Sequence, residues 1–150
     1  MKSGSLTRVT KWVLDFMFVA GIVVIVTLPF SLKLAGKYYQ SEFTEHYWFM
    51  LGVLIASGLS SLLIVRELQK MIRTVIAQNC FVYENVSCLK RMGIISFVIT
   101  AVYCTKIFVI PTAATFVVVL TFFIAGLFSE VLACVFDEAV RYKEENDLTI

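Results

Sequence analysis

Three ionisable side chains inside long apolar runs are the residues of this chain best placed to do chemistry. They are Asp15, Lys106 and Glu130. A charge at such depth in a membrane costs on the order of a few kcal/mol unless it is paired, hydrated or near an end, so each is a candidate for ion handling. Asp15 and Lys106 lie only about 4 to 6 Å of helix inside their runs, so we expect both side chains to extend to the aqueous boundary.

Glu130 lies deeper than the other two residues. Six residues separate it from Phe136, where its apolar run ends, which is about 9 Å of helix. Three interpretations stay open: a structural ion pair, a proton-coupled or cation-binding carboxylate, and contact with solvent through helix tilt. We favour the ion pair, formed with a basic residue at the same end of a neighbouring helix. The candidate partners are Arg66, Lys70 and Arg91.

No arrangement of residues known from enzymes or metal sites occurs in the sequence. The single histidine, His46, has no cluster of cysteines or carboxylates beside it. No two of the four cysteines have the C-x-x-C spacing, so we expect them to behave as small apolar residues. Phosphate-binding glycine loops, G-x-S-x-G and H-E-x-x-H are also absent from the sequence. We therefore expect a protein that is not an enzyme and that needs no metal and no cofactor.

The composition is that of a membrane protein whose main partner is the lipid bilayer. Of 150 residues, 59% are hydrophobic and 16% are charged, whereas soluble domains have roughly 45–50% and about 25%. The formal net charge of +2 is too small to suggest direct binding to nucleic acid.

Four apolar runs are each close to the roughly 20 residues that a membrane-spanning helix needs. They predict an all-α, four-helix transmembrane bundle that forms a single domain over residues 1–150. The first helix is expected at about 12–30 and ends near Pro29, and a polar loop follows from Lys33 to His46. The other three helices are expected at about 47–65 with an extension to 76, at 92–110, and at 113–136 with an extension to 145.

Small residues recur at a spacing of four in the second apolar run. They are Gly52, Ala56 and Ser60. Such a stripe lets the backbone of a neighbouring helix approach closely. We therefore expect helix packing along it.

The distribution of basic residues predicts the orientation in the membrane. The connector, which we define as residues 66–91, carries five of the thirteen Lys and Arg residues. With four spans, the N-terminal leader, the connector and the C-terminal tail lie on one side and hold ten of these residues, against three in the other two loops. The positive-inside rule places both termini and the helical extensions in the cytoplasm. The connector is then either a basic loop at anionic lipid or a docking surface.

Two segments carry a resemblance to a known family. The connector reads NCFVYENV over 79–86 and LKRMG over 89–93, and the tail reads FDEAV over 136–140 and KEENDLTI over 143–150. Both resemble the bacterial membrane family catalogued as domain of unknown function 2975. That family reads Gly-Asn-Pro-Phe at the connector turn, where this chain has Gln78 and Cys80 in the glycine and proline places. The resemblance therefore implies a less rigid turn in this chain.

The resemblance also implies a four-helix protein of the bacterial inner membrane, with no assigned activity. Members are often encoded beside a small Cro-like helix-turn-helix regulator. The leading hypothesis is a non-catalytic regulatory protein that docks such a regulator through its connector and its tail. The residues expected at the partner surface are Asn79, Phe81, Glu84 and Asn85 in the connector, and Glu145, Asn146, Asp147 and Leu148 in the tail.

An alternative hypothesis belongs to a different functional class. It is a small transporter, channel or immunity protein in which Glu130 and Asp15 handle ions. Four helices leave little room for a pathway, so this alternative requires a homo-oligomer.

Overall fold

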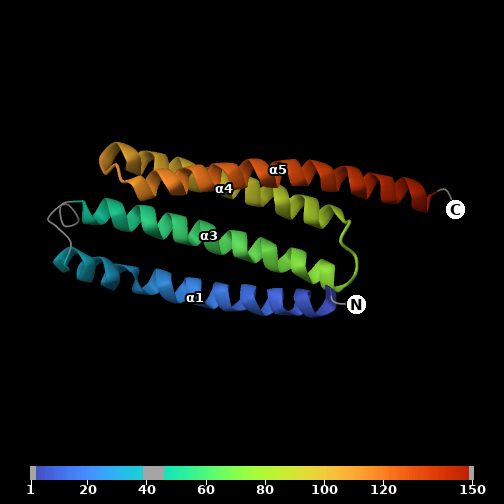
Figure 1. Cartoon of the computed structure of the whole chain (residues 1–150), viewed down its shortest axis with the longest axis horizontal. Helices are drawn as coiled ribbons and strands as arrows, with labels where there is room; N and C mark the ends of the chain where they lie inside the picture. The colour runs from blue at the N-terminus through green and yellow to red at the C-terminus, as the bar shows by residue number, and fades with distance from the viewer. Residues whose placement is uncertain (1–2, 39–45, 149–150) are drawn as a thin grey trace.

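Four long helices make up the computed structural model, which describes residues 3–38 and 46–148 (Figure 1). They are α1 (Ser3–Tyr38), α3 (Tyr47–Ile76), α4 (Tyr83–Val109) and α5 (Ala113–Asp147). Each contains a segment that is long and apolar enough to cross a membrane. This confirms the expectation of an all-α chain with four candidate spans, and the protein is a multi-pass membrane protein.

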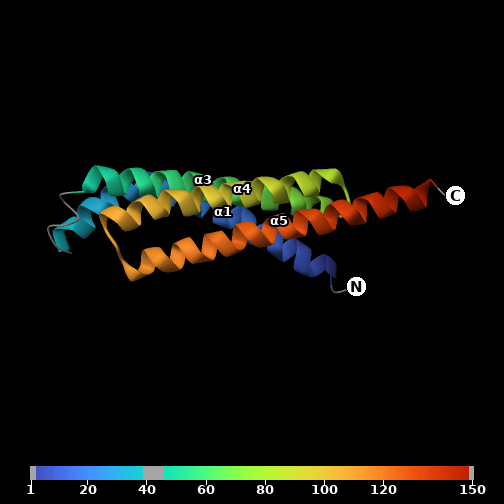
Figure 2. The ribbon, with the colours of Figure 1, turned by 90° about the horizontal axis from the view of Figure 1, so that it is seen from above.

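Each helix packs against its neighbour in the chain. α3 contacts α1 and α4, and α4 contacts α5, whereas no Cα atoms of α1 and α5 approach within 8 Å among the described residues. The four helices of the predicted bundle therefore pack as an open row. The N-terminal end of α1, the link between α3 and α4, and the C-terminal end of α5 all lie at one end of this row, which we call the connector end (Figure 1, Figure 2).

α1 is longer than the sequence predicted because Pro29 does not end it. The helix continues through Pro29 to Tyr38. A proline inside a helix removes one backbone hydrogen bond, but membrane helices tolerate this loss where neighbouring groups compensate. The Tyr47 hydroxyl donates to the Pro29 carbonyl at 3.2 Å, which joins the start of α3 to α1 at this level. The prediction of a loop was therefore wrong for residues 33–38, and residues 39–45 lie outside the described part of the chain.

The other helices differ from the sequence prediction mainly at the start of α4. This helix begins at Tyr83, nine residues before the expected position of 92. The residue before it, Val82, is extended, with φ −139° and ψ 148°, and its carbonyl accepts a hydrogen bond from the Asn85 N–H at 3.0 Å. α3 has the same bounds as the expected span with its extension, and α5 ends two residues later than expected, at Asp147.

The main cluster of buried apolar side chains lies near the connector end, between α4 and α5. Met71 at the end of α3 and two residues of α5 pack against its edge. In α5 the cluster reaches Val140, which follows the predicted span, so protein contacts rather than lipid alone hold this part of the helix. The cluster consists of Val86, Leu89, Ala133 and Val140.

α4 and α5 approach each other closely at two glycines. A Cβ atom added to Gly126 would lie 2.9 Å from the Phe97 ring, and one added to Gly93 would lie 2.6 Å from the Glu130 carboxylate. By contrast, a Cβ at Gly52 would meet no atom within 4 Å. The predicted packing along Gly52, Ala56 and Ser60 is therefore not found within the described chain. Gly52 and Ala56 are exposed, and α3 turns a different face toward its neighbours.

Candidate functional site

The turn between α3 and α4 packs directly against the last third of α5. The rings of Phe81 and Phe136 lie 5.7 Å apart between centroids, with an interplanar angle of 44°. Two residues further along the chain, the Tyr83 hydroxyl donates to Glu144 Oε2 at 3.4 Å. The structure therefore brings together the connector and the tail, the two segments that the sequence analysis selected.

A polar contact continues this junction at its solvent side. Lys143 Nζ donates to Asn79 Oδ1 at 2.9 Å. Between the two segments lies a cleft of about 250 Å³, which we call the connector–tail cleft. Phe81 and Tyr83 are each 47% exposed, so aromatic surface remains accessible at its edge. The cleft is lined by Phe81, Val82, Tyr83, Val140, Lys143, Glu144 and Asp147.

The family comparison covers most of the chain, including this junction. The family model DUF2975, described as "Protein of unknown function", matches residues 33–150. The chain belongs to the DUF2975 family. The match takes in the connector, the tail and α3 to α5, and it leaves out most of α1. The searches of curated proteins and of solved structures found no match.

Asn85 of this DUF2975 protein has a structural role rather than a surface one. Its side chain is 1% exposed. Asn85 Nδ2 donates to the Cys80 carbonyl at 2.7 Å and to Thr74 Oγ1 at 2.8 Å, and Thr74 Oγ1 donates to the Met71 carbonyl at 2.7 Å. These bonds tie the end of α3, the turn and the start of α4 together. Asn85 is enclosed and cannot face a partner, which corrects its predicted place at the partner surface.

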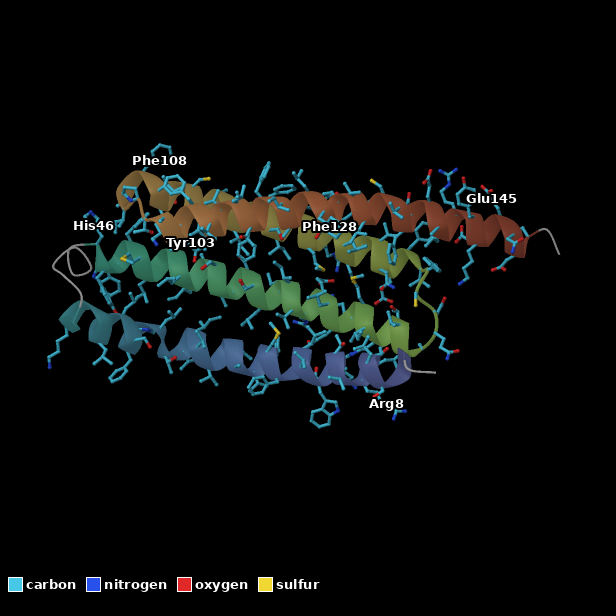
Figure 3. The ribbon with its side chains drawn as sticks, viewed as in Figure 1. Arg8, His46, Tyr103, Phe108, Phe128 and Glu145 are labelled. Carbon is cyan, nitrogen blue, oxygen red and sulfur yellow. The ribbon has the colours of Figure 1, made fainter. Side chains whose placement is uncertain are left out.

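The other connector and tail residues of the sequence prediction lie at the surface. Asn79 and Glu84 are exposed, and so are residues 145–148 of the tail, where Leu148 reaches 87%. Figure 3 shows Glu145 on the end of α5 that continues past the other helices. Apart from Asn85, these residues are placed where a partner could reach them.

The turn itself contains one residue with an unusual backbone. Gln78 has φ 56°, in the left-handed region that favours glycine. This is the place where the family resemblance has glycine. A glycine would adopt this backbone conformation freely, whereas Gln78 adopts it at a steric cost.

A buried carboxylate that the sequence analysis missed joins α3 to α4. Glu67 is 8% exposed. Its Oε1 lies 2.7 Å from Lys70 Nζ and 3.8 Å from Arg91 Nη1. The Cys88 thiol lies beside the same carboxylate, but Glu67 Oε2 is buried without a hydrogen bond of good geometry among the described residues. The spacing of Glu67 and Lys70, three residues apart in a helix, was the available signal.

The ion pair predicted for Glu130 is therefore corrected. Two of its candidate partners, Lys70 and Arg91, pair with Glu67 instead. Within residues 3–38 and 46–148, no basic group lies within 4.0 Å of the Glu130 carboxylate, which packs over Gly93 of α4. Arg66, the third candidate, is exposed at the connector end.

The remaining two ionisable residues bond to neighbouring helices. Asp15 Oδ1 accepts a hydrogen bond from Gln69 Nε2 at 2.9 Å, which joins α1 to α3. Lys106 Nζ donates to Thr115 Oγ1 at 3.2 Å, which joins the end of α4 to the start of α5. The expectation that both side chains extend to the aqueous boundary stays a prediction. Asp15 and Glu130 lie on helices that do not contact each other, so the structure does not bring them into one site.

The described residues contain no candidate metal site. No group of three or more His, Cys, Asp and Glu side chains there could hold a metal ion. The connector end instead has a surface with exposed aromatic side chains and charged side chains beside them.

Proposed function

We propose that this DUF2975 protein is a non-catalytic protein of the bacterial plasma membrane that docks a small cytosolic helix-turn-helix regulator. The regulator binds at the connector–tail cleft. One observation carries the proposal: the connector and the tail, in which the sequence resembles the family, meet in one surface, although about sixty residues separate them in the sequence.

The chemistry of the cleft supports a protein partner. Half-exposed Phe81 and Tyr83 lie next to the charged side chains of Lys143, Glu144 and Asp147. Aromatic anchors surrounded by polar residues are typical of the energetically important part of a protein interface. The contacts across the cleft also link its shape to the packing of α5 on α4. A shift of α5 under membrane stress changes the cleft and releases the regulator.

The distribution of charge supports the cytoplasmic orientation of this surface. Four exposed basic residues lie in the connector and border the membrane at this end: Arg66, Arg73, Lys90 and Arg91. The positive-inside rule assigns such a cluster to the cytoplasm. Both termini lie at the same end of the row (Figure 1), so they share its side.

Co-purification with the product of a neighbouring regulator gene tests the proposal. Tyr83→Ala and Lys143→Glu change the cleft, and we expect each to weaken capture at least about fivefold, as for residues worth more than 1 kcal/mol at an interface. Phe108→Ala is the matched control, because Phe108 is 90% exposed at the opposite end. Removal of the chain after Phe136 should abolish capture. Equal capture by all variants would overturn the proposal.

The alternative of a transporter, channel or immunity protein is less well supported. Asp15 and Glu130 lie on α1 and α5, which have no contact in one chain, so a shared ion path needs a homo-oligomer. Glu130→Gln distinguishes the two proposals. Loss of transport or of resistance in a stable, folded variant would favour the alternative, whereas unchanged transport together with unchanged regulator capture would remove Glu130 from both.

A further inference from the structure

A cleft lies between α1 and α3 and shares no lining residue with the connector–tail cleft. It measures about 300 Å³ and is lined by Phe18 of α1 and by Leu59, Leu62, Leu63 and Arg66 of α3. Leu59 and Leu63 are each 51% exposed, so the cleft is open to the surroundings. Its walls are apolar except at one end, where the only charged lining residue is an arginine.

The position of Arg66 along α3 gives the cleft a direction relative to the bilayer. The apolar run of α3 extends from Tyr47 to Val65, which is about 28 Å of helix and close to the roughly 30 Å hydrocarbon thickness. Arg66 therefore lies where the helix leaves the hydrocarbon. Leu63 and Leu59 follow at about 4.5 and 10.5 Å of helix toward the membrane interior. The cleft thus runs from the headgroup level into the acyl-chain region.

Contacts between α1 and α3 fix the two walls of the cleft. Leu62 packs on Gly21, where an added Cβ would lie 2.7 Å from a Leu62 methyl group, so the helices approach closely at this level. Nearer the connector end, Asp15 and Gln69 are joined by the hydrogen bond of 2.9 Å. The cleft is therefore held at the junction of two packed helices.

The charge at the end of the cleft is not neutralised by the protein. No carboxylate of a described residue lies within 4.0 Å of the Arg66 guanidinium. The nearest acidic residue on the facing helix, Asp15, is already bound by Gln69. Arg8 and Lys11 are exposed on α1 at the same end, and Figure 3 shows Arg8 pointing away from the other helices. Arg66 is therefore a cation with which an anion from outside the protein can pair.

We propose that this cleft binds one anionic phospholipid, with an acyl chain along Phe18, Leu59 and Leu63 and the phosphate at Arg66. A guanidinium donates two parallel hydrogen bonds to a phosphate, which fixes the headgroup more specifically than a point charge would. The charge of Arg66 favours a headgroup with net negative charge over a zwitterionic one. This site does not depend on the docking of a regulator.

Lipid binding to the full-length protein in detergent tests the proposal. We would measure by native mass spectrometry the binding of phosphatidylglycerol and of phosphatidylcholine with identical acyl chains. The wild type should prefer phosphatidylglycerol, and Arg66→Gln should reduce this preference about fivefold, the factor that corresponds to about 1 kcal/mol per cation near an anionic surface. Arg73→Gln is the matched control, because Arg73 is an exposed cation of the same helix outside the cleft.

Two further variants keep the proposal falsifiable. Leu59→Trp fills the apolar part and should lower the binding of both lipids, while glycerol phosphate without acyl chains should not compete. If Arg66→Gln does not fold, Arg66→Lys retains the charge but loses the second hydrogen bond, and it should still reduce the preference. A wild type without preference, equal effects at Arg66 and Arg73, or a change of oligomeric state at Arg66 without any change in lipid binding would each overturn the proposal.

Discussion

The α4–α5 hairpin and α1 are both long apolar helical elements, but they bury their surfaces against different partners. In the hairpin, Ala133 has no exposed surface and Val86 and Val140 are each 3% exposed. In α1, only 6% of the most apolar segment is buried inside the protein. Phe16 and Phe30, for example, are each 73% exposed. The most apolar segments of α4 and α5 are 22% and 17% buried inside the protein, so the hairpin makes more protein contact than α1 does.

This difference shows where the molecule has a defined surface. Apolar side chains gain little by leaving lipid for protein, so helix association in membranes depends on close packing and polar bonds. The hairpin has close packing at Gly93 and Gly126 and polar bonds from Lys106 to Thr115 and from Tyr83 to Glu144. The α1–α3 pair has one close contact at Gly21 and the Asp15–Gln69 bond. The connector–tail cleft thus lies beside the α4–α5 hairpin, which has more buried surface. The proposed lipid cleft lies between α1 and α3, where more apolar surface is exposed.

Asn85→Ala should cause the largest loss of stability in the chain. It removes two hydrogen bonds and leaves the Cys80 carbonyl without this partner in a buried place, which should cost about 2–3 kcal/mol. The free energy of unfolding in detergent micelles checks this. Asn79→Ala is the control, because Asn79 is exposed and should cost less than about 0.5 kcal/mol. Equal losses in the two variants would contradict the role assigned to Asn85.

Gly126→Ala should come next. The added methyl group meets the Phe97 ring at 2.9 Å, so α4 and α5 must move apart at a cost of about 1–2 kcal/mol. Gly52→Ala is the matched control, because nothing lies within 4 Å of its added Cβ and alanine favours the helix by about 1 kcal/mol. The same unfolding assay should give opposite signs for the two variants. Destabilisation by Gly52→Ala would show that a partner packs on that stripe.

Gln78→Gly should stabilise the connector by about 1 kcal/mol or slightly less. Glycine adopts the positive φ of 56° without the steric cost that glutamine has there. The gain is limited because glycine also increases the freedom of the unfolded chain. Ala77→Gly, at φ −74°, is the control and should not stabilise. A loss of stability in Gln78→Gly would show that the side chain of Gln78 matters more than its backbone.

Asp15→Asn should have the smallest effect, under about 0.5 kcal/mol, because the asparagine oxygen still accepts the bond from Gln69 at an exposed place. Unfolding and lipid-binding measurements should both remain close to the wild type. Loss of ion transport by this variant with unchanged stability would instead support the transporter alternative.

The sequence was sufficient to predict the four spans but not their packing. Length and composition of the apolar runs determine which segments can cross a membrane, and the bounds of α3 follow from its apolar run and the amphipathic turns after it. The early start of α4 was missed because polar residues between Tyr83 and Arg91 conceal a buried face with Val86 and Leu89. Whether a polar residue faces the core depends on the neighbouring helix.

The candidate site shows the same division. The sequence selected the connector and the tail, and the structure places them in contact. The sequence did not reveal that Asn85 is buried. It also did not reveal that Glu67, rather than Glu130, pairs with Lys70 and Arg91. Both results depend on which residues of different helices meet, and spacing within one helix cannot give that.

The side of the membrane on which the connector–tail cleft lies is the central claim, and cysteine labelling tests it most directly. A single cysteine at position 145, with Cys80, Cys88, Cys104 and Cys134 replaced by alanine, would be exposed to a membrane-impermeant maleimide in intact cells. A cysteine at position 46, which lies at the opposite end of the row (Figure 3), serves as the control for the other side. We predict labelling at 145 only after the inner membrane is made permeable, and labelling at 46 once the reagent reaches the outer face of that membrane. Labelling at 145 before the inner membrane is opened would contradict the account.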